Sequence, residues 1–157
     1  MVIVPTITFV ATANATRYAG ADILFCDVEP DTGLIDIPSL ERLCEEQRGK
    51  IAAIMPVHLG GQSPDLISIS EIAENHNILV VEDASHAIGS KYYSGSDDVN
   101  VGSCLHSKIT TFSFHPVKNM TMGEGGATLT NDQKIDDKIK NTNKNALSFV
   151  IFIIILC

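Results

Sequence analysis

Residues 78–87, ILVVEDASHA, join four consecutive large aliphatic side chains to two adjacent carboxylates. The continuous apolar run at residues 78–81 predicts a strand that is buried on both faces, as the strands of parallel sheets are. An acidic side chain at the carboxyl end of such a strand is costly to ionise unless a cation or a set of donors compensates it. Asp83 is therefore either a cap for the following turn or part of a functional site.

Strand and helix signals alternate on both sides of this stretch. Asp36 and Pro38 are typical of a helix start, and a second helix is predicted to begin at Ser63-Pro64. The residues predicted to face inward on these two helices are Leu40, Leu43 and Cys44, and Leu66, Ile69, Ile72 and Ala73. Further strands are predicted at residues 2–4, 21–27, 51–57, 109–114 and 126–130.

This alternation predicts βαβ units, and therefore an α/β fold with a mostly parallel sheet flanked by helices. Such sheets place their chemistry beyond the carboxyl ends of the strands. Residues 90–107 are the most loop-like stretch of the sequence.

Composition excludes several classes of protein. The chain has 157 residues, of which 45% are hydrophobic and 19% charged, so it can build a core and is not predicted to be disordered. The net charge is −8, and lysines and arginines form no cluster. Nucleic acid and anionic membrane surfaces are therefore not expected as partners.

The cysteines and the first residues indicate the compartment. Cys26, Cys44, Cys104 and Cys157 form no CxxC pair and no zinc-finger spacing, so we expect packed thiols and no metal site. The pattern fits a reducing cytosol, and no basic segment typical of a signal peptide precedes residues 2–4. We expect a cytoplasmic protein.

The end of the chain differs from the rest. Residues 131–145 are polar, whereas residues 146–157 are almost wholly apolar and too few for a membrane helix. The apolar run is either a buried strand or the product of a truncated or frameshifted reading frame, and we expect the latter. The expected division is therefore residues 1–140 as one domain and residues 141–157 as an atypical tail.

Two further side chains follow predicted strands. Lys118 lies in the loop after residues 109–114, just before a glycine-rich turn, and Phe9 lies after the first strand. Alone, these are an ordinary solvated lysine and an ordinary core phenylalanine. Together with Asp83 they match pyridoxal phosphate, whose aldehyde needs a lysine and whose ring nitrogen needs an acidic partner. A cofactor-free interaction domain would leave this combination a coincidence.

Six segments resemble the DegT/DnrJ/StrS family of sugar aminotransferases. In chain order they are TFVATANA (8–15), DVEPDTG (27–33), PVHLGGQ (56–62), EDASHAIG (82–89), SFHPVK (113–118) and GEGG (123–126). The resemblance runs from about residue 2 to about residue 140, whereas family members are more than twice as long as this chain. It implies part of the large domain of a fold-type-I aminotransferase.

The resemblance also implies roles for individual residues. Lys118 matches the lysine that forms the Schiff base and shuttles the proton, and Asp83 matches the partner of the pyridinium nitrogen. His86 matches a contact near the ring oxygen, Phe9 the aromatic that stacks on the ring, and Ser113 a phosphate contact. Lys118 also argues against the related dehydratases, which carry histidine at this position.

The implied reaction moves an amino group, with glutamate as the expected donor, to a nucleotide-linked 4-keto-6-deoxy sugar. The segment 113–126 looks most like the branch that makes a 4-amino-4,6-dideoxy-N-acetyl-altrosamine nucleotide for pseudaminic acid. Perosamine, bacillosamine and aminoarabinose enzymes remain alternatives, as does a catalytically incompetent fragment. The full-length enzyme is expected to be a homodimer.

Overall fold

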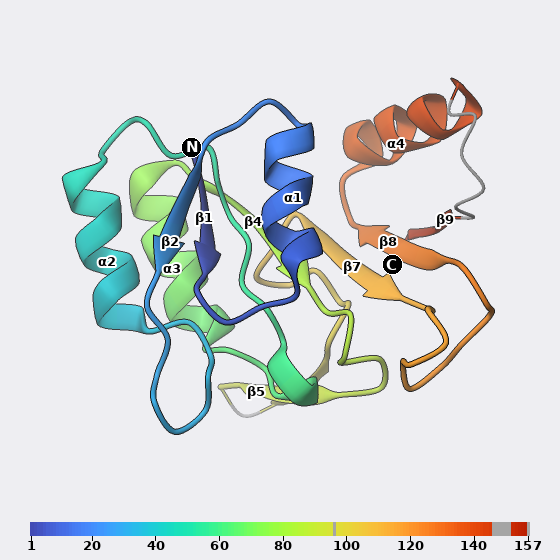
Figure 1. The fold of residues 1–157 in the computed structure, drawn as a ribbon, viewed down its shortest axis with the longest axis horizontal. Coiled ribbons are helices and arrows are strands. Elements are labelled where there is room, and N and C mark those ends of the chain that lie inside the picture. The colour runs from blue at the N-terminus through green and yellow to red at the C-terminus, as the bar shows by residue number, and fades with distance from the viewer. Residues whose placement is uncertain (96, 146–151, 157) are drawn as a thin grey trace.

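The computed structural model describes the backbone of residues 1–95, 97–145 and 152–156, and the side chains of residues 1–95 and 97–142. Its centre is a seven-stranded sheet in the order β2 (Ile23–Cys26), β1 (Val2–Pro5), β3 (Ala53–Ile54), β4 (Leu79–Asp83), β7 (Ile109–Ser113), β8 (Gly126–Thr130) and β9 (Phe152–Leu156) (Figure 1). The strands from β2 to β7 run parallel, β8 is antiparallel to β7, and β9 is parallel to β8. The expected α/β class with a mostly parallel sheet is confirmed.

The described residues form four α-helices, which are α1 (Val10–Tyr18), α2 (Ile37–Glu46), α3 (Leu66–His76) and α4 (Gln133–Asn145). Helix α2 begins where the sequence predicts, because Asp36 Oδ2 accepts a hydrogen bond from the Ser39 amide at 2.9 Å. Helix α3 begins at Leu66, after Ser63-Pro64, because Asp65 caps it by accepting from the Ser68 amide.

The main core lies between the sheet and the paired helices α2 and α3 (Figure 1). Leu40 and Cys44 of α2, and Ile69 of α3, are fully buried against strand residues such as Ile54. Six of the seven helix residues that the apolar spacing predicts to face inward are buried, and the seventh, Leu43, is partly buried against the same core. Burial of one such large aliphatic side chain stabilises the fold by roughly 1.5–3 kcal/mol.

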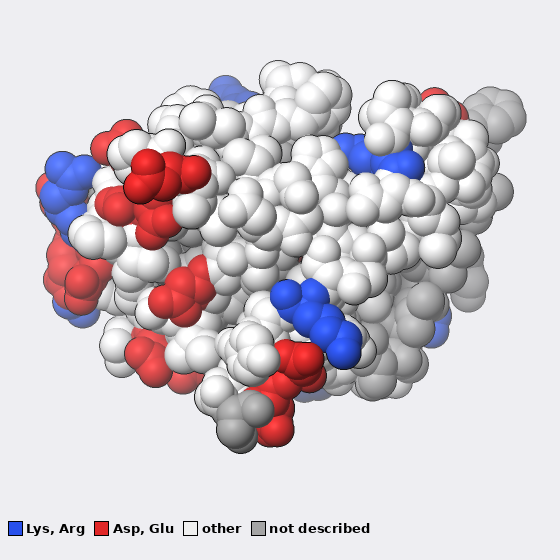
Figure 2. Space-filling view, turned by 90° about the horizontal axis from the view of Figure 1, so that it is seen from below, with Lys and Arg blue, Asp and Glu red and all other residues white. Residues whose placement is uncertain are grey.

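Charge is unevenly distributed over the surface. In the view of Figure 2, acidic side chains gather toward the end of the molecule that carries β2 and α2, and most of the remaining face is uncharged. None of the helices among the described residues is long and apolar enough to cross a membrane.

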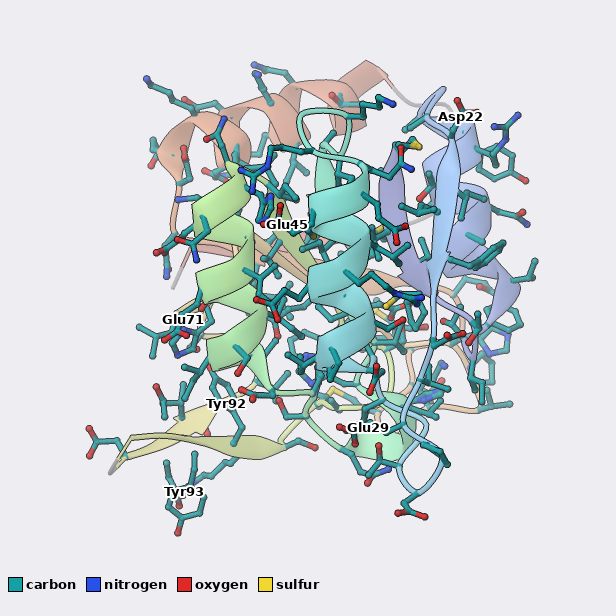
Figure 3. The ribbon with its side chains drawn as sticks, turned by 90° about the vertical axis from the view of Figure 1, so that its left-hand side faces the viewer. Asp22, Glu29, Glu45, Glu71, Tyr92 and Tyr93 are labelled. Carbon is teal, nitrogen blue, oxygen red and sulfur yellow. The ribbon has the colours of Figure 1, made fainter. Side chains whose placement is uncertain are left out.

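The composition indicates a loop at residues 90–107, but the structure differs. This stretch contains an antiparallel hairpin of β5 (Lys91–Ser94) and β6 (Asp97–Asn100). Tyr92 points toward the body of the molecule, where its ring meets the edge of the His106 ring, whereas Tyr93 points away (Figure 3). Many polar residues in this segment mask the alternation of a strand.

The chain after residue 130 is more regular than its composition indicates. Asp132 Oδ1 accepts from the Lys134 amide at 2.8 Å and starts α4, a helix that the polar composition of residues 131–145 does not indicate. Strand β9 pairs along its length with β8. The interpretation of the apolar tail as a truncation or frameshift product concerns residues 146–157, of which residues 146–151 and 157 lie outside the described residues.

Candidate active site

The predicted site residues follow three parallel strands of the sheet, of which β4 and β7 are neighbours and β1 is separated from β4 by β3. Phe9 follows β1, Asp83 is the last residue of β4, and Ser113 is the last residue of β7. Parallel strands end at the same edge, and Asp83 is paired in register with Thr111, two residues before Ser113. The topology therefore brings the loops that carry Phe9, Asp83, His86, Ser113 and Lys118 to one edge of the sheet.

Asp83 is held by donors from two elements. Thr12 Oγ1 of α1 donates to Asp83 Oδ2 at 2.7 Å. Ser85 donates to Asp83 Oδ1 through its hydroxyl at 2.6 Å and through its amide at 3.1 Å. Thr8 extends the set, since its hydroxyl lies 2.8 Å from that of Thr12. The predicted set of donors and the cap of the following turn are thus both present, and the place of Asp83 in a functional site stays a prediction.

Phe9 is the N-cap residue of α1, and it is not the core residue that its ordinary interpretation predicts. Its side chain is 72% exposed, whereas Thr12, three residues further along, is buried and reaches Asp83. The aromatic ring is therefore presented at the end of α1 that adjoins Asp83.

His86 lies in the turn after Asp83 and is partly buried. The Gly60 amide donates to His86 Nδ1 at 3.3 Å, so this nitrogen acts as an acceptor. At Gly61 the backbone has a φ of +87°, and an added Cβ would lie 3.2 Å from the His86 carbonyl oxygen. Glycine at this position allows the loop after β3 to pack closely against the His86 turn.

Lys118 lies in the loop at residues 114–125, between β7 and β8. The Phe114 amide donates to the Gly125 carbonyl at 2.8 Å, and the Met122 amide to the Phe114 carbonyl at 3.0 Å, which closes the base of the loop. Lys118 is half-buried, and within the described part of the chain its ammonium group makes no ion pair. Ser113 Oγ accepts from the His115 amide at 3.3 Å, at the entrance of the same loop.

The glycine-rich turn has a packing reason. A Cβ at Gly126 would lie 2.6 Å from the Phe112 carbonyl oxygen, which no real side chain tolerates. Gly126 is also paired in register with Ser113. Glycine here lets β8 approach β7 closely and anchors the loop that carries Lys118.

Sequence reasoning missed the residues that support Asp83. Thr12 and Ser85 hold its carboxylate, and no spacing rule links Thr12 to a residue 71 positions away. Sequence reasoning also missed the buried pair directly behind the site, in which His58 Nε2 lies 2.7 Å from Glu82 Oε2. A glutamate in an otherwise apolar strand, two residues after Val80, is the signal that could have indicated it.

A cavity of about 500 Å³ lies elsewhere. Its lining includes Cys104, Lys108 and Asn131, which precede β7 or follow β8 and therefore lie at the opposite edge of the sheet. It takes no part in the candidate active site.

A model of the DegT/DnrJ/EryC1/StrS aminotransferase family matches residues 1–148, and the chain belongs to this family. It is 42% identical over 139 residues to the GDP-perosamine synthase of Caulobacter vibrioides, with 88% of this chain and 35% of that protein covered. It is 41% identical over 140 residues to the UDP-4-amino-4,6-dideoxy-N-acetyl-beta-L-altrosamine transaminase of Campylobacter jejuni, with 89% of this chain and 35% of that protein covered.

Among solved structures, the chain resembles Helicobacter pylori PseC, an aminotransferase involved in the biosynthesis of pseudoaminic acid. The TM-score is 0.77 at 34% identity, over 88% of this chain and 35% of that one. The expected fold, part of the large domain of a fold-type-I aminotransferase, is confirmed. The chain spans 35% of the length of these curated relatives. The family match extends through α4 to residue 148, and the division of the chain at residue 140 stays a prediction.

Proposed function

We propose that this chain forms the cofactor-binding part of an aminotransferase that transfers an amino group from glutamate to a nucleotide-linked 4-keto-6-deoxy sugar. The observation that carries the proposal is the carboxylate of Asp83, which Thr12 and Ser85 hold at the carboxyl end of β4. Lys118 lies in the loop after the adjacent parallel strand. Membership of the aminotransferase family supports the same activity.

The described residues fit pyridoxal phosphate. The cofactor has a ring nitrogen, an aldehyde, an aromatic face and a phosphate, and when bound it supplies an electron sink for the substrate carbon. Asp83 would face the ring nitrogen, because a carboxylate that its neighbours orient can accept the hydrogen of that nitrogen. The exposed ring of Phe9 would cover the aromatic face.

Three further residues complete the proposed site. Ser113 would donate to the phosphate, and His86 would lie beside the ring oxygen. Lys118 Nζ would hold the aldehyde carbon, and it would move the proton at the substrate carbon that gains the amino group. Attack on the aldehyde carbon uses the neutral amine, whereas delivery of a proton to the substrate carbon uses the ammonium, so Lys118 must both accept and release a proton in one turnover.

The sugar is proposed only as a class. The perosamine and altrosamine enzymes resemble this chain about equally, at 42% and 41% identity. We keep the altrosamine branch, which feeds pseudaminic acid, as the first substrate to test, followed by perosamine, bacillosamine and aminoarabinose precursors. The full-length enzyme is proposed to be a homodimer.

A second candidate is a catalytically incompetent part of such an enzyme. The chain spans 35% of the length of its curated relatives, and this candidate places the substrate contacts in the part of those proteins that the match does not cover. This candidate has the same cofactor site and differs only in turnover.

The test is the absorbance spectrum of the purified chain with pyridoxal phosphate, before and after borohydride reduction, followed by mass mapping of the adduct. We expect a visible band and a reduced adduct on Lys118. Lys118→Ala should remove both, whereas the matched control Lys108→Ala, an exposed lysine at the opposite end of β7, should keep both. Adducts scattered over surface lysines would overturn the proposal. Turnover of keto-sugar nucleotides then separates the enzyme from the incompetent fragment.

A further inference from the structure

Two consecutive carboxylates at the end of β4 lie on opposite faces of the sheet. Val80 packs in the core with residues of α2 and α3, and because side chains alternate along a strand, Glu82 lies on that face too. Figure 3 views the molecule from the side of α2 and α3. Asp83 points to the other face, where it meets Thr12 of α1.

Glu82 is 2% exposed and its carboxylate is fully occupied by donors. His58 Nε2 lies 2.7 Å from Oε2, and the hydroxyl groups of Ser107 and Thr110 donate to Oε1 at 2.5 and 2.8 Å. Burial alone would raise the pKa of Glu82, but the hydrogen bonds from His58, Ser107 and Thr110 outweigh it and lower this pKa. Glu82 is therefore ionised at neutral pH, and since a carboxylate only accepts, His58 Nε2 is the donor.

His58 is also joined to Asp83 through the backbone. The His58 amide donates to the Asp83 carbonyl at 3.0 Å, and the Asp83 amide donates to the Pro56 carbonyl at 2.9 Å. Segment 56–58 thus continues the sheet beside Asp83. The imidazole of His58 is completely buried, and its hydrogen bond to Glu82 fixes the position of His58. The His58 amide in turn binds the Asp83 carbonyl, so the position of Glu82 affects that of the Asp83 backbone.

A charged carboxylate buried beside a histidine is a poor way to gain stability, because apolar side chains of similar size fill the same space without loss of hydration. Glu82 and His58 lie directly behind Asp83 and can therefore affect the position of its backbone. We propose that Glu82 and His58 are positioning residues, which hold the backbone of Asp83 so that its carboxylate faces the ring nitrogen of the cofactor. This inference rests on the proposed function, because Asp83 has that partner only if the chain binds pyridoxal phosphate.

The test compares pyridoxal phosphate with its 1-deaza analogue, in which carbon replaces the ring nitrogen. Glu82→Gln keeps the shape of the side chain and removes its charge. We expect this variant to bind pyridoxal phosphate about tenfold more weakly, the value of one hydrogen bond to a charged group, and the analogue less than about twofold more weakly. Equal weakening for both ligands would overturn the inference, because a general loss of structure does not distinguish the ring nitrogen.

Two controls separate positioning from stability. Ile72→Val removes a methylene from the same core without touching the pair, so it should lower the free energy of unfolding and leave the ratio of the two affinities unchanged. Ser107→Ala removes one donor from Glu82 and is the milder variant if Glu82→Gln does not fold. It should change the ratio in the same direction, and an unchanged ratio would overturn the inference. Wild-type chain that binds neither ligand would instead overturn the proposed function.

Discussion

Thr12 Oγ1 lies 2.7 Å from Asp83 Oδ2, which joins the first helix to the end of β4 across 71 positions of sequence. Thr12 is buried, and Asp83 Oδ1 is already occupied by Ser85. The orientation of the carboxylate therefore depends on a helix that precedes it by several elements. Loss of this one contact should affect both the stability of the fold and the site.

Thr12→Val removes the hydroxyl and keeps the shape of the side chain. We expect the free energy of unfolding to fall by about 1–3 kcal/mol, because a partly buried carboxylate oxygen loses the hydroxyl group that donates to it. Affinity for pyridoxal phosphate should fall by roughly tenfold, as for one charged hydrogen bond. Urea unfolding and cofactor titration measure the two effects.

The matched control is Thr16→Val on the same helix. Thr16 is equally buried, but its hydroxyl faces the Met55 sulfur at 3.7 Å instead of a carboxylate. It should leave cofactor affinity unchanged. An equal loss of affinity in both variants would contradict a specific role for Thr12.

Phe9→Ala tests the exposed aromatic. Because its side chain is 72% exposed, we expect little change in the free energy of unfolding, within about 0.5 kcal/mol. Cofactor affinity should fall by about threefold to tenfold through the loss of ring stacking. Tyr18→Ala, at the other end of α1 and 88% exposed, is the control and should change neither quantity. Unchanged affinity in Phe9→Ala would remove Phe9 from the proposed site.

The lowered pKa of Glu82 makes the free energy of unfolding depend on pH. Its pKa in the folded chain is lower than the ordinary carboxyl value, so the unfolded chain binds the proton more readily. The stabilisation is therefore fully present above the ordinary carboxyl pKa, and it is lost as the pH falls through the lower folded-state pKa. Urea unfolding from pH 7 to pH 3 should show this loss, and Glu82→Gln should flatten it. The same slope in the variant would assign the pH dependence to other groups.

Gly126→Ala tests the close approach of β7 and β8. The added methyl group would lie 2.6 Å from the Phe112 carbonyl oxygen, so the strands must separate, and overpacking of this kind costs about 1–3 kcal/mol. The loop that carries Lys118 should shift with them, and the Lys118 adduct with pyridoxal phosphate should form more slowly. Gly20→Ala is the control, because Gly20 has a backbone φ of +76° and an added Cβ would meet no atom within 4 Å. It should lower the free energy of unfolding by about 1–2 kcal/mol without slowing adduct formation. An unchanged rate of adduct formation in Gly126→Ala would contradict the link between the spacing of β7 and β8 and the position of Lys118.

The features that sequence reasoning predicted correctly are local ones. Asp36 caps α2 three residues before the amide that it binds, and Ile69, Ile72 and Ala73 of α3 are buried as their spacing predicts. The hairpin at residues 91–100 and helix α4 were not predicted, because their segments are polar and their stability depends on packing against other elements.

Local sequence patterns were enough to predict the parallel strands, the helices α2 and α3, and the placement of Asp83 at the end of one strand and Lys118 in the loop after another. These follow from apolar periodicity and capping, which extend over a few residues. Only the tertiary structure decided that Thr12 holds Asp83 and that His58 meets Glu82, since these pairs are 71 and 24 positions apart. Such contacts depend on strand order and register, which bring distant segments together only after the sheet has formed.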